Sequence, residues 1–374
     1  MRNAPLCTGK CCPQGDFLEA TGLGAACGGA AAKRWRSVAE AEGVFVRRDA
    51  GPASAASAAS TGSKQRPLSR AEALARPGMD LVGDPNAQKA AYNIPGYVTG
   101  KGGEVGNLQM VWGPGTFGYT PSDLAQFYDE FSVANADEAT VSGFGNPGEM
   151  GGDNWYEGTL DVTYVSSLGA GAETVVANTN SSVSTEETTG FGYALLAFSE
   201  SLASAGTGGE GSLPTLPNVV SMSLGSLSFD SCASLCGGLA SAGTYTEQEC
   251  EDYMATQRQV CMYDGGDLVD RINAEFMKAS ARGVTLLAAT GDGGSHFSFG
   301  AFEDDGAIGS ALNDMSCGLQ LPTFPAESPF VLGVGGEQWE GGGSAEAPVY
   351  WYAGGAGFSR RFKMPSYQKE AVAG

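Results

Sequence analysis

Short apolar runs alternate with amphipathic stretches from about residue 105 of this 374-residue chain, and this alternation constrains the fold most strongly. The apolar runs are rich in β-branched residues and have the length of strands, whereas the stretches between them have the periodicity of helices. A repeated strand-helix order predicts an α/β fold, with a mostly parallel sheet that carries helices on both faces. The predicted strands span residues 108–112, 140–143, 173–178, 218–224, 284–289 and 330–334, and the predicted helices span 122–131, 155–168, 191–203 and 268–282.

The predicted strand at 218–224 ends in residues that suit a binding site. Ligands of open α/β sheets bind at the carboxyl ends of the strands. This strand runs from an apolar core into Ser223, Leu224 and Gly225, where small residues let an extended substrate backbone approach closely. The alternative interpretation is an ordinary core strand that ends in a turn.

Three acidic residues are candidates for proton transfer. Glu157 and Asp161 are four residues apart in the predicted helix 155–168, so both project from one face. If that face is buried, the two carboxyl groups share a proton and one pKa rises, which gives a base and an orienting partner. Asp292 follows Gly291 at the end of another predicted strand. The alternatives are a solvated acidic helix face and a solvated turn aspartate.

The single histidine, His296, limits the chemistry that the chain can perform. A Ser-His-Asp hydrolase would have to use it, and a site with several histidine ligands is excluded. We therefore expect carboxyl groups to carry any acid-base chemistry. His296 itself is interpreted as a loop residue.

The net charge of -21 is unevenly distributed, because residues 1–80 carry +4 and the remaining residues carry -25. An acidic body repels phosphate backbones, so nucleic acid is not an expected partner. An acidic working pH would relieve its self-repulsion. No apolar run approaches the ~18 residues of a membrane span, so no membrane partner is expected either.

Nine cysteines include four within 30 residues, at positions 232, 236, 250 and 261. They predict either two disulfides that clamp an inserted loop, which indicates an oxidising compartment, or a metal clip. Cys317 has no obvious partner. Residues 1–70 contain Ala-Ser repeats and are predicted to be a low-complexity, disordered tail without a secretory signal, although an organellar transit peptide remains open.

Several segments together closely resemble the sedolisins, the serine-carboxyl peptidases, and most of all their tripeptidyl-peptidase branch. The combination of the E-x-x-x-D helix, the glycine-flanked aspartate and the PTFPA run is highly specific. The matching segments occur in the family's order and are YNIPGYVTG (92–100), SDLAQFY (122–128), EGTLDVTY (157–164), NVVSMSLG (218–225), INAEFMKASARGVTLLAATGDGG (272–294), PTFPAESPFVLGVGG (322–336) and GGAGFSRRFKMPSYQKEAVAG (354–374).

The resemblance implies a subtilisin-like fold for a partial peptidase domain at 85–374, with the Cys-containing stretch 230–264 as an insertion. Residues 71–84 resemble the end of an inhibitory prosegment and a linker, so a zymogen is implied. A peptide or protein substrate is implied as partner, together with a lysosomal, vacuolar or secreted location.

The resemblance also implies the roles of the acidic residues. Glu157 is similar to the base that takes the proton from the serine, Asp161 to the residue that orients this base, and Asp292 to the acid of the oxyanion hole. An acidic pH optimum is implied as well.

A peptide substrate is implied to pair with the strand end. Ser223, Leu224 and Gly225 resemble the family's substrate-pairing strand, and Gly291 is expected to bind substrate beside them. Thr290 replaces the serine of the family's Ser-Gly-Asp.

The family's nucleophile is absent from the matching segments. It lies in a G-T-S-A motif downstream of the segment at which this chain ends, and the 374 residues contain no such motif; Ser344, in a Gly-Ser-Ala triplet, is only superficially similar. The family's Ca²⁺ site is also C-terminal, so Ca²⁺ is expected for a complete member and no metal ligand is expected here. The sequence therefore predicts a C-terminally incomplete fragment that is inactive alone.

Two alternatives to a peptidase remain. The first is a non-catalytic relative that binds peptides or acts as a decoy. The second takes Glu157 and Asp292 as the carboxyl pair of an acid glycosidase.

Overall fold

The structure is a computed structural model that describes residues 83–94, 107–115, 117–133, 141–144, 155–169, 171–179, 190–209, 211–262, 266–294, 302, 307–316, 319–338, 349–350 and 354–373. The predicted tail at 1–70 and all of the 71–84 segment except its last two residues lie outside these ranges, and so do His296, Cys317 and Ser344. Among the described residues, no helix has the length and apolar character needed to cross a membrane.

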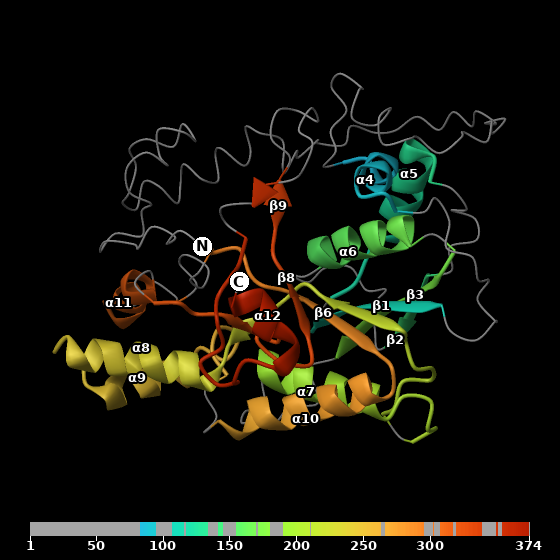
Figure 1. Cartoon of the computed structure of the whole chain (residues 1–374). Coiled ribbons are helices and arrows are strands. Elements are labelled where there is room, and N and C mark those ends of the chain that lie inside the picture. The colour runs from blue at the N-terminus through green and yellow to red at the C-terminus, as the bar shows by residue number, and fades with distance from the viewer. Residues whose placement is uncertain are drawn as a thin grey trace, which may run out of the picture.

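A six-stranded sheet in the order β2-β3-β1-β4-β6-β8 forms the centre of the fold (Figure 1). Every neighbouring pair of strands in it is parallel. The strands are β1 (Leu108–Pro114), β2 (Val141–Phe144), β3 (Glu173–Thr179), β4 (Val219–Met222), β6 (Thr285–Ala289) and β8 (Leu332–Val334). Each corresponds to one of the six predicted strands, so the predicted mostly parallel α/β sheet is confirmed.

Helices cover both faces of this sheet, as predicted. The helices are α5 (Pro121–Phe131) and α6 (Trp155–Leu168) on one face, and α7 (Phe191–Ala203) and α10 (Asp267–Ala281) on the other (Figure 1). Side chains alternate between the faces of a strand, and β1 shows this clearly. Trp112 belongs to the core beneath α7 and stacks on Phe198 with ring centroids 4.8 Å apart, whereas its neighbour Val111 belongs to the core beneath α5 and α6.

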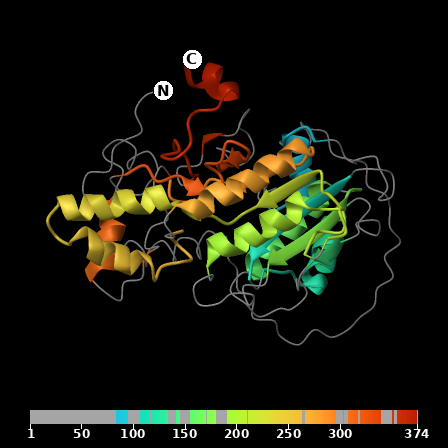
Figure 2. The ribbon, with the colours of Figure 1, turned by 90° about the horizontal axis from the view of Figure 1, so that it is seen from below.

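A second group of helices lies to one side of the sheet (Figure 2). It consists of α8 (Phe229–Ser241), α9 (Glu247–Met254) and α11 (Ala307–Ser316), which enclose a separate apolar core around Leu235, Phe302 and Leu312. Disulfides Cys232–Cys261 and Cys236–Cys250 cross-link the predicted insertion, so the structure takes the first of the two alternatives for its four cysteines.

Shorter elements complete the described chain. They are α4 (Pro85–Ala91), β5 (Ser226–Leu227), β7 (Thr323–Phe324), β9 (Glu337–Gln338), β10 (Val349–Tyr350), the 3-10 helix η4 (Ser366–Gln368) and α12 (Lys369–Ala373). β5 pairs with β7 and β9 with β10, both antiparallel. The predicted strand 218–224 was too long at its carboxyl end, because the chain leaves the sheet after Met222 and Ser223 bonds to a side chain of α6 instead.

Candidate active site

The position of the two helical acids is set by a close contact at the start of α6. Gly158 lies directly after Glu157, and a methyl group on it would lie 2.8 Å from the carbonyl carbon and 2.9 Å from the nitrogen of Gly118. The Thr159 hydroxyl accepts a hydrogen bond from the Thr120 backbone N–H at 3.2 Å. The first turn of α6 therefore lies directly against the 117–120 segment, and this contact fixes where Glu157 and Asp161 lie.

Asp161 lies in the most desolvated part of the site. Its Oδ1 accepts a hydrogen bond from the Ser223 hydroxyl at 2.8 Å, and its Oδ2 is buried with no hydrogen-bond partner in the described part of the chain. Burial raises the pKa of Asp161 to about 7, the Ser223 hydrogen bond acts in the opposite direction, and the Glu157 charge adds a smaller increase. Asp161 is therefore neutral in acid and titrates close to neutrality.

Glu157 and Asp292 are shifted in the same direction. Burial, followed by the charge of Asp292, raises the pKa of Glu157. Burial also raises the pKa of Asp292, although its side chain retains an exposed surface. The structure thus brings together three acids, two from one turn of α6 and one from the loop after β6. Glu157 and Asp161 are half-buried, so the alternative of a solvated helix face does not describe them, whereas Asp292 is exposed, as the alternative of a turn aspartate predicts.

The Asp292 loop is held by a segment from much later in the chain. Gly291 has a φ of 97°, which a residue with a side chain rarely adopts. Its carbonyl accepts from the Gly355 N–H at 2.6 Å, and the Thr290 hydroxyl donates to the Gly355 carbonyl at 2.6 Å. One more bond, from the Ala356 N–H to the Gly294 carbonyl at 2.9 Å, completes the contact.

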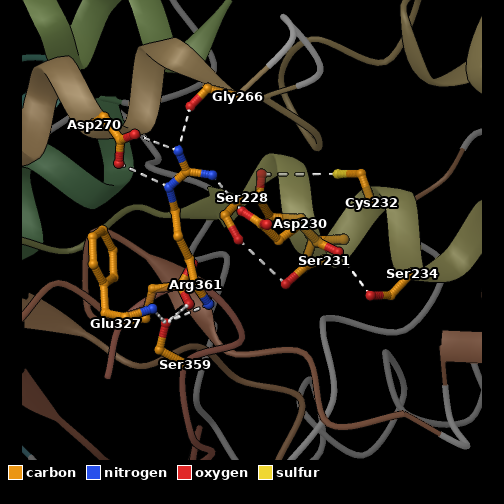
Figure 3. Close-up of polar contacts among 12 residues, drawn as sticks. Ser228, Asp230, Ser231, Cys232, Ser234, Gly266, Asp270, Glu327, Ser359 and Arg361 are labelled. Atoms are coloured by element: carbon orange, nitrogen blue, oxygen red, sulfur yellow. Dashed lines mark hydrogen bonds and ion pairs between the residues drawn. The ribbon is translucent and has the colours of Figure 1, made fainter. Parts of the chain in front are cut away.

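Arg361 anchors this supporting segment to two helices (Figure 3). Its guanidinium donates to both carboxylate oxygens of Asp270 on α10, at 2.9 and 2.6 Å, to Asp230 on α8 at 2.7 Å and to the Gly266 carbonyl at 2.7 Å. The nearby Ser359 hydroxyl donates to Glu327 Oε2 at 2.6 Å. The segment that contains Gly355 and Ala356, which bonds to the Asp292 loop, is therefore held in place by the ion pairs of Arg361.

The candidate substrate edge lies between two glycines. Ser223, Leu224 and Gly225 follow β4, where all three are half-buried. A Cβ on Gly225 would meet the Thr323 side chain at 3.2 Å, and a Cβ on Gly291 would meet it at 3.4 Å. The lack of side chains at both positions thus makes room for Thr323, whose side chain packs against the end of β4 and the Asp292 loop.

Thr323 is a site residue that was not anticipated from the sequence. It is buried, lies between the two glycines, and its hydroxyl has no hydrogen-bond partner within the described ranges. The available signal was the PTFPA run, which was recognised as a match but gave no indication that its threonine faces the strand end.

No group of three or more His, Cys, Asp or Glu side chains is arranged to hold a metal ion among the residues that the structure describes.

Comparison with known proteins gives a partial match. A stretch of 105 residues is 42% identical to tripeptidyl-peptidase 1 of Rattus norvegicus, and stretches of 104 and 105 residues are 40% identical to the proteins of Homo sapiens and Canis lupus familiaris. The chain is similar to tripeptidyl-peptidase 1. The match covers 28% of this chain and 16% of each tripeptidyl-peptidase 1, so it confirms the resemblance to the sedolisins over that stretch.

Two other comparisons complete this result. No protein-family model matches the chain. A Pseudomonas sedolisin, a serine-carboxyl proteinase solved with two molecules of pseudo-iodotyrostatin, superposes with a TM-score of 0.43 and 18% identity, over 71% of this chain and 61% of the sedolisin.

Proposed function

We propose that this chain carries the carboxyl groups of a serine-carboxyl peptidase site that hydrolyses peptide bonds in acid. The observation that carries the proposal is that Glu157 and Asp161, both half-buried, lie beside the more exposed Asp292, and that the pKa values of all three are raised. The similarity to tripeptidyl-peptidase 1 supports peptides as the substrate class.

The proposed roles follow from what each carboxyl group can do with its proton. Glu157, when ionised, removes the proton from the attacking serine and later returns it to the leaving amine. Asp161 holds Glu157 in place through a shared proton. Asp292, when neutral, donates a hydrogen bond to the negative oxygen of the tetrahedral intermediate.

A peptide substrate is proposed to lie along Ser223, Leu224 and Gly225, with its scissile carbonyl near Gly291 and Asp292. Backbone hydrogen bonds to the residues that follow β4, which are half-buried, would hold the peptide extended. The two disulfides support an oxidising route to an acidic compartment, of the lysosomal, vacuolar or secreted kind.

The experiment is a peptide-hydrolysis assay between pH 3 and pH 7 on the protein isolated from its own cells, beside Glu157→Gln, Asp161→Asn and Asp292→Asn variants. We expect each variant to lose about 100-fold or more in kcat/KM, the usual effect of removing an acid-base or oxyanion group. Asp123→Asn, which changes an exposed carboxylate on α5, serves as the matched control. Unchanged hydrolysis by Glu157→Gln would refute the proposed base.

A second candidate is a peptide-binding or decoy relative, in which the residues after β4 hold a peptide that the protein does not cleave. Fluorescence anisotropy with labelled peptides at pH 4 separates it from the first. Binding without cleavage by the protein from its own cells would select the second candidate, and the absence of both would reject the two together.

A further inference from the structure

The hydrogen bond between Ser223 and Asp161 joins the end of β4 to the acid pair on α6. The two residues are 62 positions apart in the chain, and the Ser223 Oγ to Asp161 Oδ1 distance is 2.8 Å. Ser223 thus belongs to the proposed substrate edge through its backbone and to the acid pair through its side chain. Because Ser223 belongs to both, the end of β4 and the acid pair on α6 are linked through one side chain.

The bond distinguishes the two oxygens of the Asp161 carboxyl group. Oδ1 accepts the proton of the serine hydroxyl, whereas Oδ2 is buried and has no partner in the described residues. A neutral carboxylic acid carries its proton on one oxygen and accepts with the other. Since Oδ1 is occupied as an acceptor, Oδ2 is the atom left to carry the proton.

No positive charge near Asp161 competes with the Ser223 hydroxyl in stabilising the ionised carboxylate, among the residues that the structure describes. Glu157, on the same helix, is the charged group that acts on Asp161, and Asp292, from the loop after β6, acts on Glu157. Among the described residues, no Lys or Arg forms an ion pair with any of the three acids. The Ser223 hydroxyl is therefore the polar contact that favours the ionised form of Asp161.

We propose that Ser223 is a positioning residue for the acid pair: its hydroxyl fixes the orientation of the Asp161 carboxyl group and keeps the acid proton of Asp161 on Oδ2. The proposal rests on the function proposed above and extends it, because Ser223, a residue of the proposed substrate edge, would control the ionisation of Asp161, the partner of the base Glu157. A peptide that pairs with the backbone of Ser223 would then contact the same residue whose side chain determines which Asp161 oxygen carries the proton.

The test is a carbon-13 NMR titration of the Asp161 carboxyl carbon in protein labelled at aspartate, with the signal assigned by its loss in Asp161→Asn. We expect a wild-type pKa of about 7. Ser223→Ala should raise it by about one pH unit, the typical effect of a hydrogen bond to a charged group. Ser223→Thr, which keeps the hydroxyl, should restore the wild-type value, and Ser223→Val, its isostere without the hydroxyl, should not.

Ser221→Ala is the matched control, because Ser221 lies two residues earlier, within β4, and is also half-buried. An unchanged Asp161 pKa in Ser223→Ala, or an equal shift in Ser221→Ala, would overturn the proposal. If the Ser223 variants fail to fold, an NMR measurement on the wild-type protein tests the proposal instead. Above pH 8, the Ser223 hydroxyl proton should give a proton signal that is protected from exchange with water and correlates with the Asp161 carboxyl carbon. The absence of this signal would also overturn the proposal.

This titration requires neither substrate nor nucleophile, so its failure is distinguishable from failure of the peptide assays. An active protein offers one more readout that a purely structural role would not change. The alkaline limb of its pH profile should move upward in Ser223→Ala and return in Ser223→Thr.

Discussion

Replacing Gly158 by alanine tests whether the contact between α6 and the 117–120 segment positions the acids. Glycine inside a helix is less favourable than alanine by about 1 kcal/mol, so helix propensity alone predicts that Gly158→Ala stabilises the protein. The structure predicts the opposite sign, because the new methyl group would overlap the backbone of Gly118.

The magnitude follows from the size of this overlap. Carbon atoms in contact are normally about 3.5 to 4 Å apart, whereas the new methyl carbon would lie 2.8 Å from the Gly118 carbonyl carbon. Backbone cannot rotate away as a side chain can, so the cost lies near the upper end of overpacking, about 3 kcal/mol. After the gain in propensity, we expect the free energy of unfolding to fall by about 2 kcal/mol.

Urea denaturation followed by circular dichroism measures this change, with Gly237→Ala as the control. Gly237 lies inside α8, and a Cβ there would meet no atom within 4 Å, so this substitution should stabilise by about 0.5 to 1 kcal/mol. Stabilisation by both variants would refute the proposed contact. Peptide hydrolysis or binding should also weaken in Gly158→Ala alone, since the acids move with the helix.

Three further predictions concern stability. The folded-state pKa of Asp161, about 7, lies above its ordinary value of 3.8, so between these pH values the folded protein binds a proton that the unfolded chain does not. The free energy of unfolding should therefore fall as the pH rises from about 4 to about 7. The urea midpoint, plotted against pH over this range, should fall less steeply in Asp161→Asn. Arg361→Gln should reduce the free energy of unfolding by about 1 to 2 kcal/mol and speed amide exchange in the Asp292 loop. The control Arg271→Gln removes an exposed ion pair with an N–O distance of 3.6 Å and should change the free energy of unfolding by less than about 0.5 kcal/mol. Equal effects of the two substitutions would contradict the anchoring role of Arg361. Reduction of Cys232–Cys261, whose cysteines are 29 residues apart, should lower the stability of α8 and α9 by about 3 kcal/mol, and unchanged exchange rates in those helices after reduction would argue against that disulfide.

The central sheet could be predicted because its signal is local. Strands such as β1 and β3 are short apolar runs buried between two helical layers, and the helices between the strands keep a regular periodicity, as in α10 with Ile272 and Phe276 buried on one face. α8 and α9 were interpreted only as an insertion. α8 contains the pair Gly237–Gly238, which is unfavourable in a helix interior, and packing against α11 and the two disulfides stabilise it from outside its own sequence.

The acids could be found from the sequence, but their contacts could not. The four-residue spacing of Glu157 and Asp161 follows from helix geometry, and the glycine beside Asp292 is visible in the chain. The bond from Ser223 to Asp161 and the position of Thr323 between two glycines depend on how segments about 30 to 100 residues apart pack together. Residue spacing carries no information about such contacts.

The cross-linked excursion formed by α8 and α9 leaves the fold and returns to it at nearly the same place. Leu227 exchanges backbone hydrogen bonds with Val260 and Met262, and Cys261 is tied to Cys232 immediately after the exit point. Changes in length or composition between these two points need not be transmitted to β4. The part of the excursion beyond Cys232 can therefore change in length or composition without altering β4, whereas Asp230, just before Cys232, has to stay because it pairs with Arg361.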